Sequence, residues 1–359
     1  MKRVLGILKW VGIAILSLIA IVFIVRWTGQ AINNRTPKGG INESLYVDIN
    51  GSRQWINIYG QDLDNPVLLY LHGGPGSSTS LYDYAFTRKW SDVYTVVTWD
   101  QRGCGKNYDK SHLETITADI MMQDGKVMTE YLRDHLNVEK IILLGHSWGS
   151  YFGANLALAY PDYYEAFIGT GQFIDRDENE KRLYEAALTW SENDPDGREM
   201  VEKWAPTGGA QDMDIVLRNN IMVRYGYGIM KDGTDYSFPK AVFFNPNFSL
   251  KGIMGFLKNQ LDVYNNQYAS FYASDGFQEM SLLGRYDYAI PFYNINGDLD
   301  YQTNYSLACE YFEQVKAPVK KMYVMKDATH GLLESRSEEV SGYLHEIAAD
   351  LARSSGDPE

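Results

Sequence analysis

The sequence has 359 residues, of which 45% are hydrophobic and 22% are charged, and its formal net charge is −13 at pH 7. This length and composition predict a globular chain with one large domain and exclude a disordered or low-complexity protein. Residues 1–42 hold six of the 33 basic residues and no acidic residue, so 27 basic and 46 acidic residues give the rest a net charge of −19. Such a domain repels a phosphate backbone, and no nucleic-acid partner is expected.

The N-terminal segment is apolar enough to cross a membrane. Residues 4–25 would form a helix about 33 Å long, which matches the thickness of a bilayer core. Three basic residues at the start predict a cytoplasmic N-terminus and an extracytoplasmic domain. We therefore expect residues 1–42 to be a membrane anchor and linker. The alternatives are a signal peptide cleaved near Gly29-Gln30-Ala31, which would give a secreted protein, and a buried core helix.

Short β-type runs follow the linker, and helical patterns lie between them. The expected strands are 45–49, 54–59, 67–71, 94–99, 140–144, 166–169, 291–295 and 321–325, and the expected helices are 120–136, 151–160, 306–312 and 337–351. The first two strands should form a hairpin that turns at Asn50-Gly51. The later runs are continuously apolar, as strands buried on both faces are. The alternation predicts an α/β fold with a mostly parallel eight-stranded sheet flanked by helices.

Residues 172–285 interrupt this alternation. The segment is rich in Tyr, Phe and Met and begins with a charged helical stretch at 175–188. It is too long to be a structureless loop, so we expect a largely helical insertion that covers the sheet. The predicted organisation is a membrane anchor and linker (1–42), a core formed by residues 43–171 and 286–359, and a helical cap (172–285).

The sharpest chemical motif is Gly145-His146-Ser147-Trp148-Gly149. It follows the apolar run "KIILL" directly and precedes a predicted helix. That context is the one a nucleophile elbow requires, because glycines on both sides permit a tight turn that exposes the central hydroxyl. Ser147 is therefore the predicted nucleophile.

A serine nucleophile needs a base and an acid that orients the base, and in such elbows both follow the serine in the chain. His330, in "KDATHGLLE", follows the last strand on a loop and is the predicted base. His72 and His146 lie inside motifs, and His112, His135 and His345 are expected at the surface. For the acid, Asp300 is favoured because it lies three residues beyond Gly297. Asp298, which is expected to close the turn, and Asp175 are the alternatives.

Other chemistry is not indicated. His and Cys residues do not cluster at metal-ligand spacing, so neither a metal nor a cofactor is expected. Cys104 and Cys309 make at most one disulfide, and two unpaired thiols are the favoured interpretation.

Five motifs together resemble the α/β-hydrolase superfamily. They are HGGPG (72–76), DQRGCGK (100–106), GHSWGS (145–150), GDLD (297–300) and ATHG (328–331). More narrowly, they resemble the proline iminopeptidase-like branch, over roughly residues 43–171 and 286–352. The resemblance implies that Ser147, Asp300 and His330 form a catalytic triad. It also implies an oxyanion hole made by the backbone N–H groups of Gly74 and Trp148, and a helical cap at 172–285.

Two features depart from that branch. Lys106-Asn107 stands where the branch usually has serine, and the N-terminal anchor is not usual there. Family aminopeptidases bind the substrate's amino group with cap glutamates, but no motif assigns one here. The candidates are Glu178, Glu180, Glu185, Glu192, Glu199 and Glu202.

Three functions are therefore compatible with the sequence. The first is an aminopeptidase of the proline iminopeptidase type that acts on short peptides through an acyl-enzyme. The second is an esterase or lactonase for small acyl substrates, with a pocket lined by cap aromatics such as Tyr225, Tyr227 and Phe243. The third is a non-catalytic binding protein on the same fold. An intact triad disfavours the third.

Overall fold

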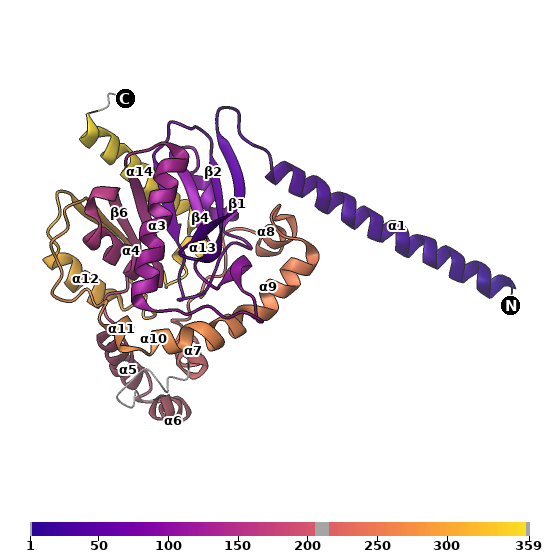
Figure 1. Ribbon diagram of the computed structural model, residues 1–359. Coiled ribbons are helices and arrows are strands. Elements are labelled where there is room, and N and C mark those ends of the chain that lie inside the picture. The colour runs from indigo at the N-terminus through magenta and orange to yellow at the C-terminus, as the bar shows by residue number, and fades with distance from the viewer. Residues whose placement is uncertain (1, 205–214, 357–359) are drawn as a thin grey trace.

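The computed structural model describes residues 2–204 and 215–356. A long helix, α1 (Lys2–Asn33), projects from a body in which helices surround a sheet (Figure 1). No residue in the most apolar window of α1 is buried against the rest of the chain, and the helix is long and apolar enough to span a membrane. The absence of burial excludes the core-helix alternative. A membrane anchor and a signal sequence both remain compatible with it.

The sheet has eight strands in the order β1-β2-β4-β3-β5-β6-β7-β8. Their bounds are β1 (Ile41–Ile49), β2 (Ser52–Gly60), β3 (Val67–Leu71), β4 (Thr95–Trp99), β5 (Ile141–His146), β6 (Tyr164–Thr170), β7 (Phe292–Gly297) and β8 (Lys320–Met325). The pairs β1/β2 and β2/β4 are antiparallel and the other five are parallel. Asn50 and Gly51 both have positive φ at the β1/β2 turn, as a two-residue hairpin loop requires. The predicted mostly parallel eight-stranded sheet is confirmed.

Helices cover both faces of the sheet. Residues Leu69, Leu71 and Leu143 pack with α3 (Ala118–Leu136), α4 (Trp148–Ala159) and α12 (Tyr305–Gln314) in one apolar cluster. The alternate residues of the same strands pack with α13 (Leu332–Ser335) and α14 (Ser337–Ser355) in another. Burial on both faces explains why β3 is apolar throughout and why β4 and β5 are mainly apolar. The short elements α2 (Tyr84–Thr87), η1 (Arg88–Trp90), η2 (Gly105–Asn107) and η3 (Pro161–Tyr163) complete this body.

The chain between β6 and β7 is helical, as expected for residues 172–285. It forms α5 (Arg176–Trp190), α6 (Pro195–Trp204), α7 (Ile215–Arg224), α8 (Phe238–Phe244), α9 (Leu250–Val263), the π-helical turn η5 (Tyr264–Tyr268), α10 (Ala269–Tyr272) and α11 (Asp275–Gln278). Residues 205–214 of the predicted cap lie outside the described residues. In Figure 1 these helices lie along one side of the sheet, with α8 and α9 next to the C-terminal end of α1.

The C-terminal turns of α1 dock on α8 and on the loop that follows it. Arg26 donates hydrogen bonds to the carbonyls of Phe243 and Phe248, the latter at 2.6 Å. Gln30 donates to the Asn245 carbonyl at 2.7 Å, and Asn33 donates to the Phe244 carbonyl at 3.0 Å. The last carbonyls of a helix have no partner inside it, so the side chains of α1 supply donors that the end of α8 lacks.

Candidate active site

Ser147 occupies a sharp turn between β5 and α4. Its backbone angles are φ 56° and ψ −123°, a conformation that side-chain-bearing residues rarely adopt. The turn needs glycine on both sides, because a Cβ at Gly145 would lie 2.1 Å from the Gly149 carbonyl oxygen, and a Cβ at Gly149 would lie 1.9 Å from the Leu71 carbonyl oxygen. The G-x-S-x-G motif therefore forms the sharp turn that the sequence predicted.

Asp300 and His330 meet although 30 residues separate them in the chain. His330 Nδ1 lies 2.7 Å from Asp300 Oδ2, and both side chains are buried. Asp300 follows β7 and His330 follows β8, and parallel neighbouring strands bring their carboxyl ends to one edge of the sheet. Thr303 donates to both oxygens of Asp300, through its N–H at 3.0 Å and its hydroxyl at 2.9 Å. These bonds fix the carboxylate that orients the imidazole.

The His330 ring lies beside the elbow. It packs against the ring of His146, the residue before Ser147, with 4.7 Å between ring centroids. Burial lowers the pKa of His146 well below its usual value, and the neighbouring His330 adds to this. His146 Nδ1 lies 3.0 Å from the Thr170 hydroxyl. The His146 ring is thus neutral and packs between the elbow and His330.

The two predicted oxyanion donors line the same cavity as Ser147. Gly74 and Trp148 both border it. Within residues 2–204 and 215–356, neither of their N–H groups donates a hydrogen bond to another residue. Trp148 is the first residue of α4, where backbone N–H groups have no partner inside the helix. At Gly74 φ is +119°, and a Cβ would lie 2.6 Å from the Gly76 and Ser77 nitrogens, so only glycine fits.

Gln101 is a positioning residue that sequence reasoning missed. Its side-chain oxygen accepts from the Trp148 indole at 2.9 Å, and its side-chain nitrogen donates to the His72 carbonyl at 3.2 Å. Gln101 therefore ties the HGGPG loop to the start of α4, which are the two segments that carry Gly74 and Trp148. The signal was present in the DQRGCGK motif, but only the fold shows what the glutamine contacts.

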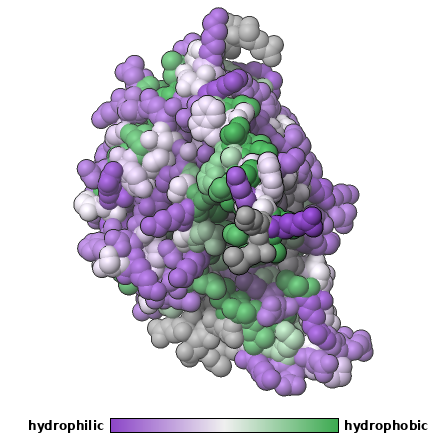
Figure 2. Space-filling model, turned by 90° about the vertical axis from the view of Figure 1, so that its right-hand side faces the viewer, coloured by the Kyte–Doolittle hydropathy of each residue, from purple (hydrophilic) through white to green (hydrophobic). Residues whose placement is uncertain are grey.

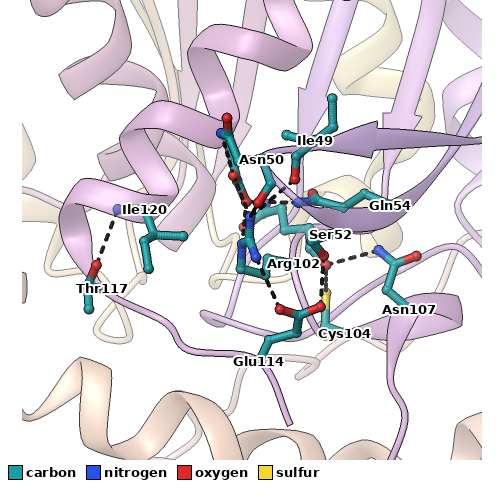
Figure 3. Close-up of polar contacts among 12 residues, drawn as sticks. Ile49, Asn50, Ser52, Gln54, Arg102, Cys104, Asn107, Glu114, Thr117 and Ile120 are labelled. Atoms are coloured by element: carbon teal, nitrogen blue, oxygen red, sulfur yellow. Dashed lines mark hydrogen bonds and ion pairs between the residues drawn. The ribbon is translucent and has the colours of Figure 1, made fainter. Parts of the chain in front are cut away.

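The arginine of the same motif is structural. Arg102 binds Asp124 of α3 through Nε at 2.6 Å and Nη2 at 2.8 Å, and Glu114 through Nη1 at 3.1 Å (Figure 3). It also donates to the carbonyls of Ile49 and Asn50 at the β1/β2 turn. Both carboxylates and the hairpin carbonyls surround the guanidinium, so its charge is fully paired. This network joins the hairpin to α3, and Arg102 is not among the described residues that line the cavity at Ser147.

Lys106, which belongs to the pair that stands where the branch usually has serine, also has a structural role. Lys106 donates to the Asn247 carbonyl at 2.6 Å, and its ammonium lies 3.6 Å from the centroid of the Trp55 ring. Burial lowers the pKa of Lys106 to about 8. The side chain fastens the loop between α8 and α9, on which α1 docks, to the sheet.

The cavity at Ser147 has a volume of about 440 Å³, counted with its open mouth. Besides Gly74, Ser147 and Trp148, it is lined by Phe173, Ile215, Arg218, Tyr264, Tyr272, Phe277, Gln302 and Thr303. Five of the described lining residues, counting Trp148, are aromatic, and Arg218 gives this part of the wall a positive charge. Tyr225, Tyr227 and Phe243 are not among its described lining residues, so that expectation was wrong. Phe243 instead lies under Arg26 at the α1 junction, and Tyr227 stacks on Trp190.

One cap glutamate lies close to this cavity, and it is paired. Glu180 accepts from Arg218 Nε at 2.8 Å and from Arg218 Nη2 at 2.9 Å. Arg218 also donates to the Gln302 side chain at 2.5 Å, and both charged side chains are buried. Arg218, which lines the cavity, therefore neutralises the Glu180 carboxylate. The candidates Glu178, Glu199 and Glu202 pair with basic residues of their own helices nearer the surface.

The alternative acids face elsewhere. Asp298 accepts from the Asp327 backbone N–H at 2.7 Å and so closes the turn between neighbouring strands. Asp175 is the N-cap of α5 and also accepts from Gln278 and Ser281.

Cys104 and Cys309 are both free thiols. Among the described residues, no group of three or more His, Cys, Asp or Glu side chains is arranged to hold a metal.

Residues 66–211 match the α/β hydrolase fold family. The chain is 34% identical over 149 residues to the probable aminopeptidase YbaC of Bacillus subtilis. This matched region covers 41% of this chain and 46% of that protein. It is 28% identical over 163 residues to a proline iminopeptidase of Lactobacillus helveticus, covering 41% and 54%. It therefore spans about half the length of these curated relatives.

The fold is also similar to the crystal structure of a membrane phospholipase A. The TM-score is 0.58 at 16% identity, and the match covers 98% of this chain and 99% of the other. The sequence and structure matches together confirm the predicted α/β hydrolase fold and the resemblance of the motifs to proline iminopeptidases.

Proposed function

We propose that this α/β hydrolase is a membrane-anchored serine hydrolase that works through an acyl-enzyme on Ser147, and that its first candidate activity is that of an aminopeptidase. The observation that carries the proposal is the hydrogen-bonded Asp300–His330 pair beside the strained Ser147 elbow. A serine that borders a cavity, an oriented imidazole and two free N–H groups are the parts that acyl transfer needs.

The mechanism follows from these groups. Asp300 accepts a hydrogen bond from the Nδ1–H group of His330, which leaves the unprotonated Nε2 as the base. His330 takes the proton of Ser147, the oxygen attacks the carbonyl carbon, and the N–H groups of Gly74 and Trp148 stabilise the oxyanion. His330 then gives the proton to the leaving amine or alcohol. Water, activated by the same imidazole, releases the acyl group and regenerates the serine. One donor in such a hole is typically worth about 3–4 kcal/mol of transition-state stabilisation.

The aminopeptidase candidate is supported by the sequence relatives, which are named for that activity. The test is turnover of aminoacyl and prolyl arylamides by the full chain in detergent, with Ser147→Ala as the control and N-acetylated arylamides as the matched substrates. An aminopeptidase is supported if the arylamides with a free amino group are cleaved and the N-acetylated arylamides are not. Covalent labelling of Ser147 by a fluorophosphonate would exclude the non-catalytic binding protein.

Hydrolysis of acyl esters is the second candidate, and the Glu180–Arg218 pair favours it. A substrate ammonium needs an available carboxylate, whereas both oxygens of Glu180 already accept from Arg218. The aromatic wall of the cavity suits an apolar acyl chain, and the fold is shared with a membrane phospholipase A along nearly the whole chain. Turnover of acyl esters with inert arylamides would select this candidate, and inactivity on both classes would refute the proposed hydrolase.

Membrane anchoring through residues 4–25 is supported by the fully exposed apolar surface of α1. Cleavage near Gly29-Gln30-Ala31 would remove Arg26, which holds two carbonyls at the end of α8. The docking of α1 therefore favours a retained helix over a cleaved signal. Mass measurement of the mature protein and its extraction by alkaline carbonate test this directly. Release by carbonate, or loss of residues 1–29, would contradict the anchor.

A further inference from the structure

Helix α9 carries a buried apolar face and, beside it, an exposed apolar stripe. Ile253, Phe256 and Val263 are buried against the body. On the other face Leu250, Met254, Leu257 and Leu261 are 40%, 69%, 50% and 69% exposed. Steps of four, three and four residues place these side chains on one continuous stripe. A contiguous exposed apolar stripe on a folded domain marks an interaction surface.

The stripe begins beside the docking point of α1. Phe248, whose carbonyl accepts from Arg26 and Gln30 of α1, lies two residues before the first residue of α9. In Figure 1, α9 runs away from α8 on the side of the body from which α1 leaves. Figure 2 views this side, where α1 points toward the viewer and contributes apolar residues to the centre of the view. The exposed apolar surface of α1 and the stripe on α9 therefore belong to the same side of the molecule.

The charges around the stripe are basic. Lys251 and Lys258 are exposed on the side of α9 that flanks the stripe, and Lys240 of α8 is also exposed. Asp262, the acidic residue of α9, is paired with Lys110 at 3.3 Å. Outside its first 42 residues the chain carries a strong acidic excess, so this local surplus of lysine departs from its surroundings. An apolar stripe flanked by lysines fits the headgroup region of a bilayer that contains anionic lipid.

We propose that the exposed face of α9 inserts into the lipid leaflet at the C-terminal end of α1, with anionic phospholipid as its ligand. This inference rests on the proposed membrane anchor. The helix lies in the plane of the interface, its leucines and methionine contact acyl chains, and Lys251 and Lys258 contact phosphates. η5 follows α9 directly, and Tyr264 of η5 lines the cavity at Ser147. The inserted helix thus places one wall of the candidate active site next to the lipid surface.

The test uses nitroxide labels on the full chain with Cys309→Ser, since Cys104 is buried. Labels are placed at Leu257→Cys or Leu261→Cys on α9, at Ile15→Cys on α1, and at Val324→Cys on β8, the sheet edge opposite β1. The protein is reconstituted at high dilution in vesicles of phosphatidylcholine with a minority of phosphatidylglycerol. Collision with oxygen reports lipid, and collision with a soluble nickel chelate reports water.

We expect the α9 labels to resemble the α1 label, with several-fold less chelate collision than the β8 label. Chelate access at α9 equal to that at β8, with the α1 label protected, would overturn the insertion of α9 and leave the anchor intact. Chelate access at the α1 label would instead refute the anchor, and the present inference with it. Protection of α9 from both reagents with spin–spin broadening would show a second copy on the stripe, which also overturns the proposal.

A charge variant provides an independent check. Met254→Glu with Leu257→Glu changes exposed side chains, so folding should be retained, and the label at Leu261→Cys should gain chelate access several-fold. Replacing both Lys251 and Lys258 by Gln should reduce protection in vesicles with phosphatidylglycerol more than in pure phosphatidylcholine. Unchanged protection in both variants would contradict the lipid contact.

Discussion

His330 Nδ1 lies 2.7 Å from Asp300 Oδ2, and the two residues follow adjacent parallel strands at one edge of the sheet. A carboxylate in this position fixes the tautomer of the imidazole and stabilises its charged form during proton transfer. The relationship separates Asp300 from Asp298, which lies two residues earlier and binds a backbone N–H group.

Replacing Asp300 by Asn should lower kcat by about 10³–10⁴-fold, because the amide favours the wrong imidazole tautomer. Asp298→Asn is the matched control and should retain most activity. The measurement is kcat on whichever ester or arylamide the wild type turns over, with Ser147→Ala as the baseline. Similar losses for both aspartate variants would remove the distinction between them.

Replacing Glu180 by Gln should destabilise the cap strongly. The buried Arg218 guanidinium would lose its counter-charge, and breaking a buried pair in this way costs about 3–5 kcal/mol. The control is Glu178→Gln, whose pairs with Lys181 and Arg182 lie nearer the surface and should be worth at most about 1 kcal/mol. Denaturant unfolding in detergent measures both. Equal losses would show that the buried pair is not special.

Replacing Arg26 by Ala should loosen α8 and the loop that follows it. The Phe243 carbonyl would lose its side-chain donor and the Phe248 carbonyl would keep only Gln30, and an unsatisfied buried acceptor costs about 1–3 kcal/mol. Hydrogen–deuterium exchange in peptides covering residues 238–263 should accelerate, while exchange in β5 stays unchanged. Arg35→Ala, at an exposed position of the linker, is the control. No change in the 238–263 peptides would argue against the docking of α1.

The stability of the fold should fall as the pH rises from about 4 to about 8. Burial, aided by the nearby charge of Asp100, raises the pKa of Asp83 to about 8, whereas an unfolded chain has an Asp pKa of about 4. The folded state thus keeps a proton that the unfolded state releases, and each pH unit costs at most about 1.4 kcal/mol of stability for one such group. Burial also raises the pKa of Asp100 to about 6, which acts in the same direction at lower pH.

Asp83→Asn removes this titration, so its Tm should depend less on pH than that of the wild type. Thermal unfolding at pH 5 and pH 8 in detergent measures the difference. If the Tm of the wild type and the Tm of the variant change by the same amount between pH 5 and pH 8, the assignment to Asp83 is contradicted.

The strands were predictable because burial on both faces demands apolar residues at every position, as in β3 and β5. The hairpin was predictable because Asn50-Gly51 tolerates the positive φ that its turn needs. The approach of Asp300 to His330 could also be expected, since both follow strands whose carboxyl ends point to the same edge. The pairing of Glu180 with Arg218 could not, because the two residues lie on separate cap helices and nothing local links them.

The parallel sheet, the apolar N-terminal helix, the sharp turn at Ser147 and the residue types for acyl transfer could all be predicted from the sequence, because each depends on local pattern or backbone geometry. Three further features became visible in the folded chain alone: which aromatic residues line the cavity, that Arg218 neutralises Glu180, and that α1 docks on the end of α8. Those outcomes depend on how helices distant in the chain pack together. Side-chain contacts across such packing leave no periodic signal along the sequence.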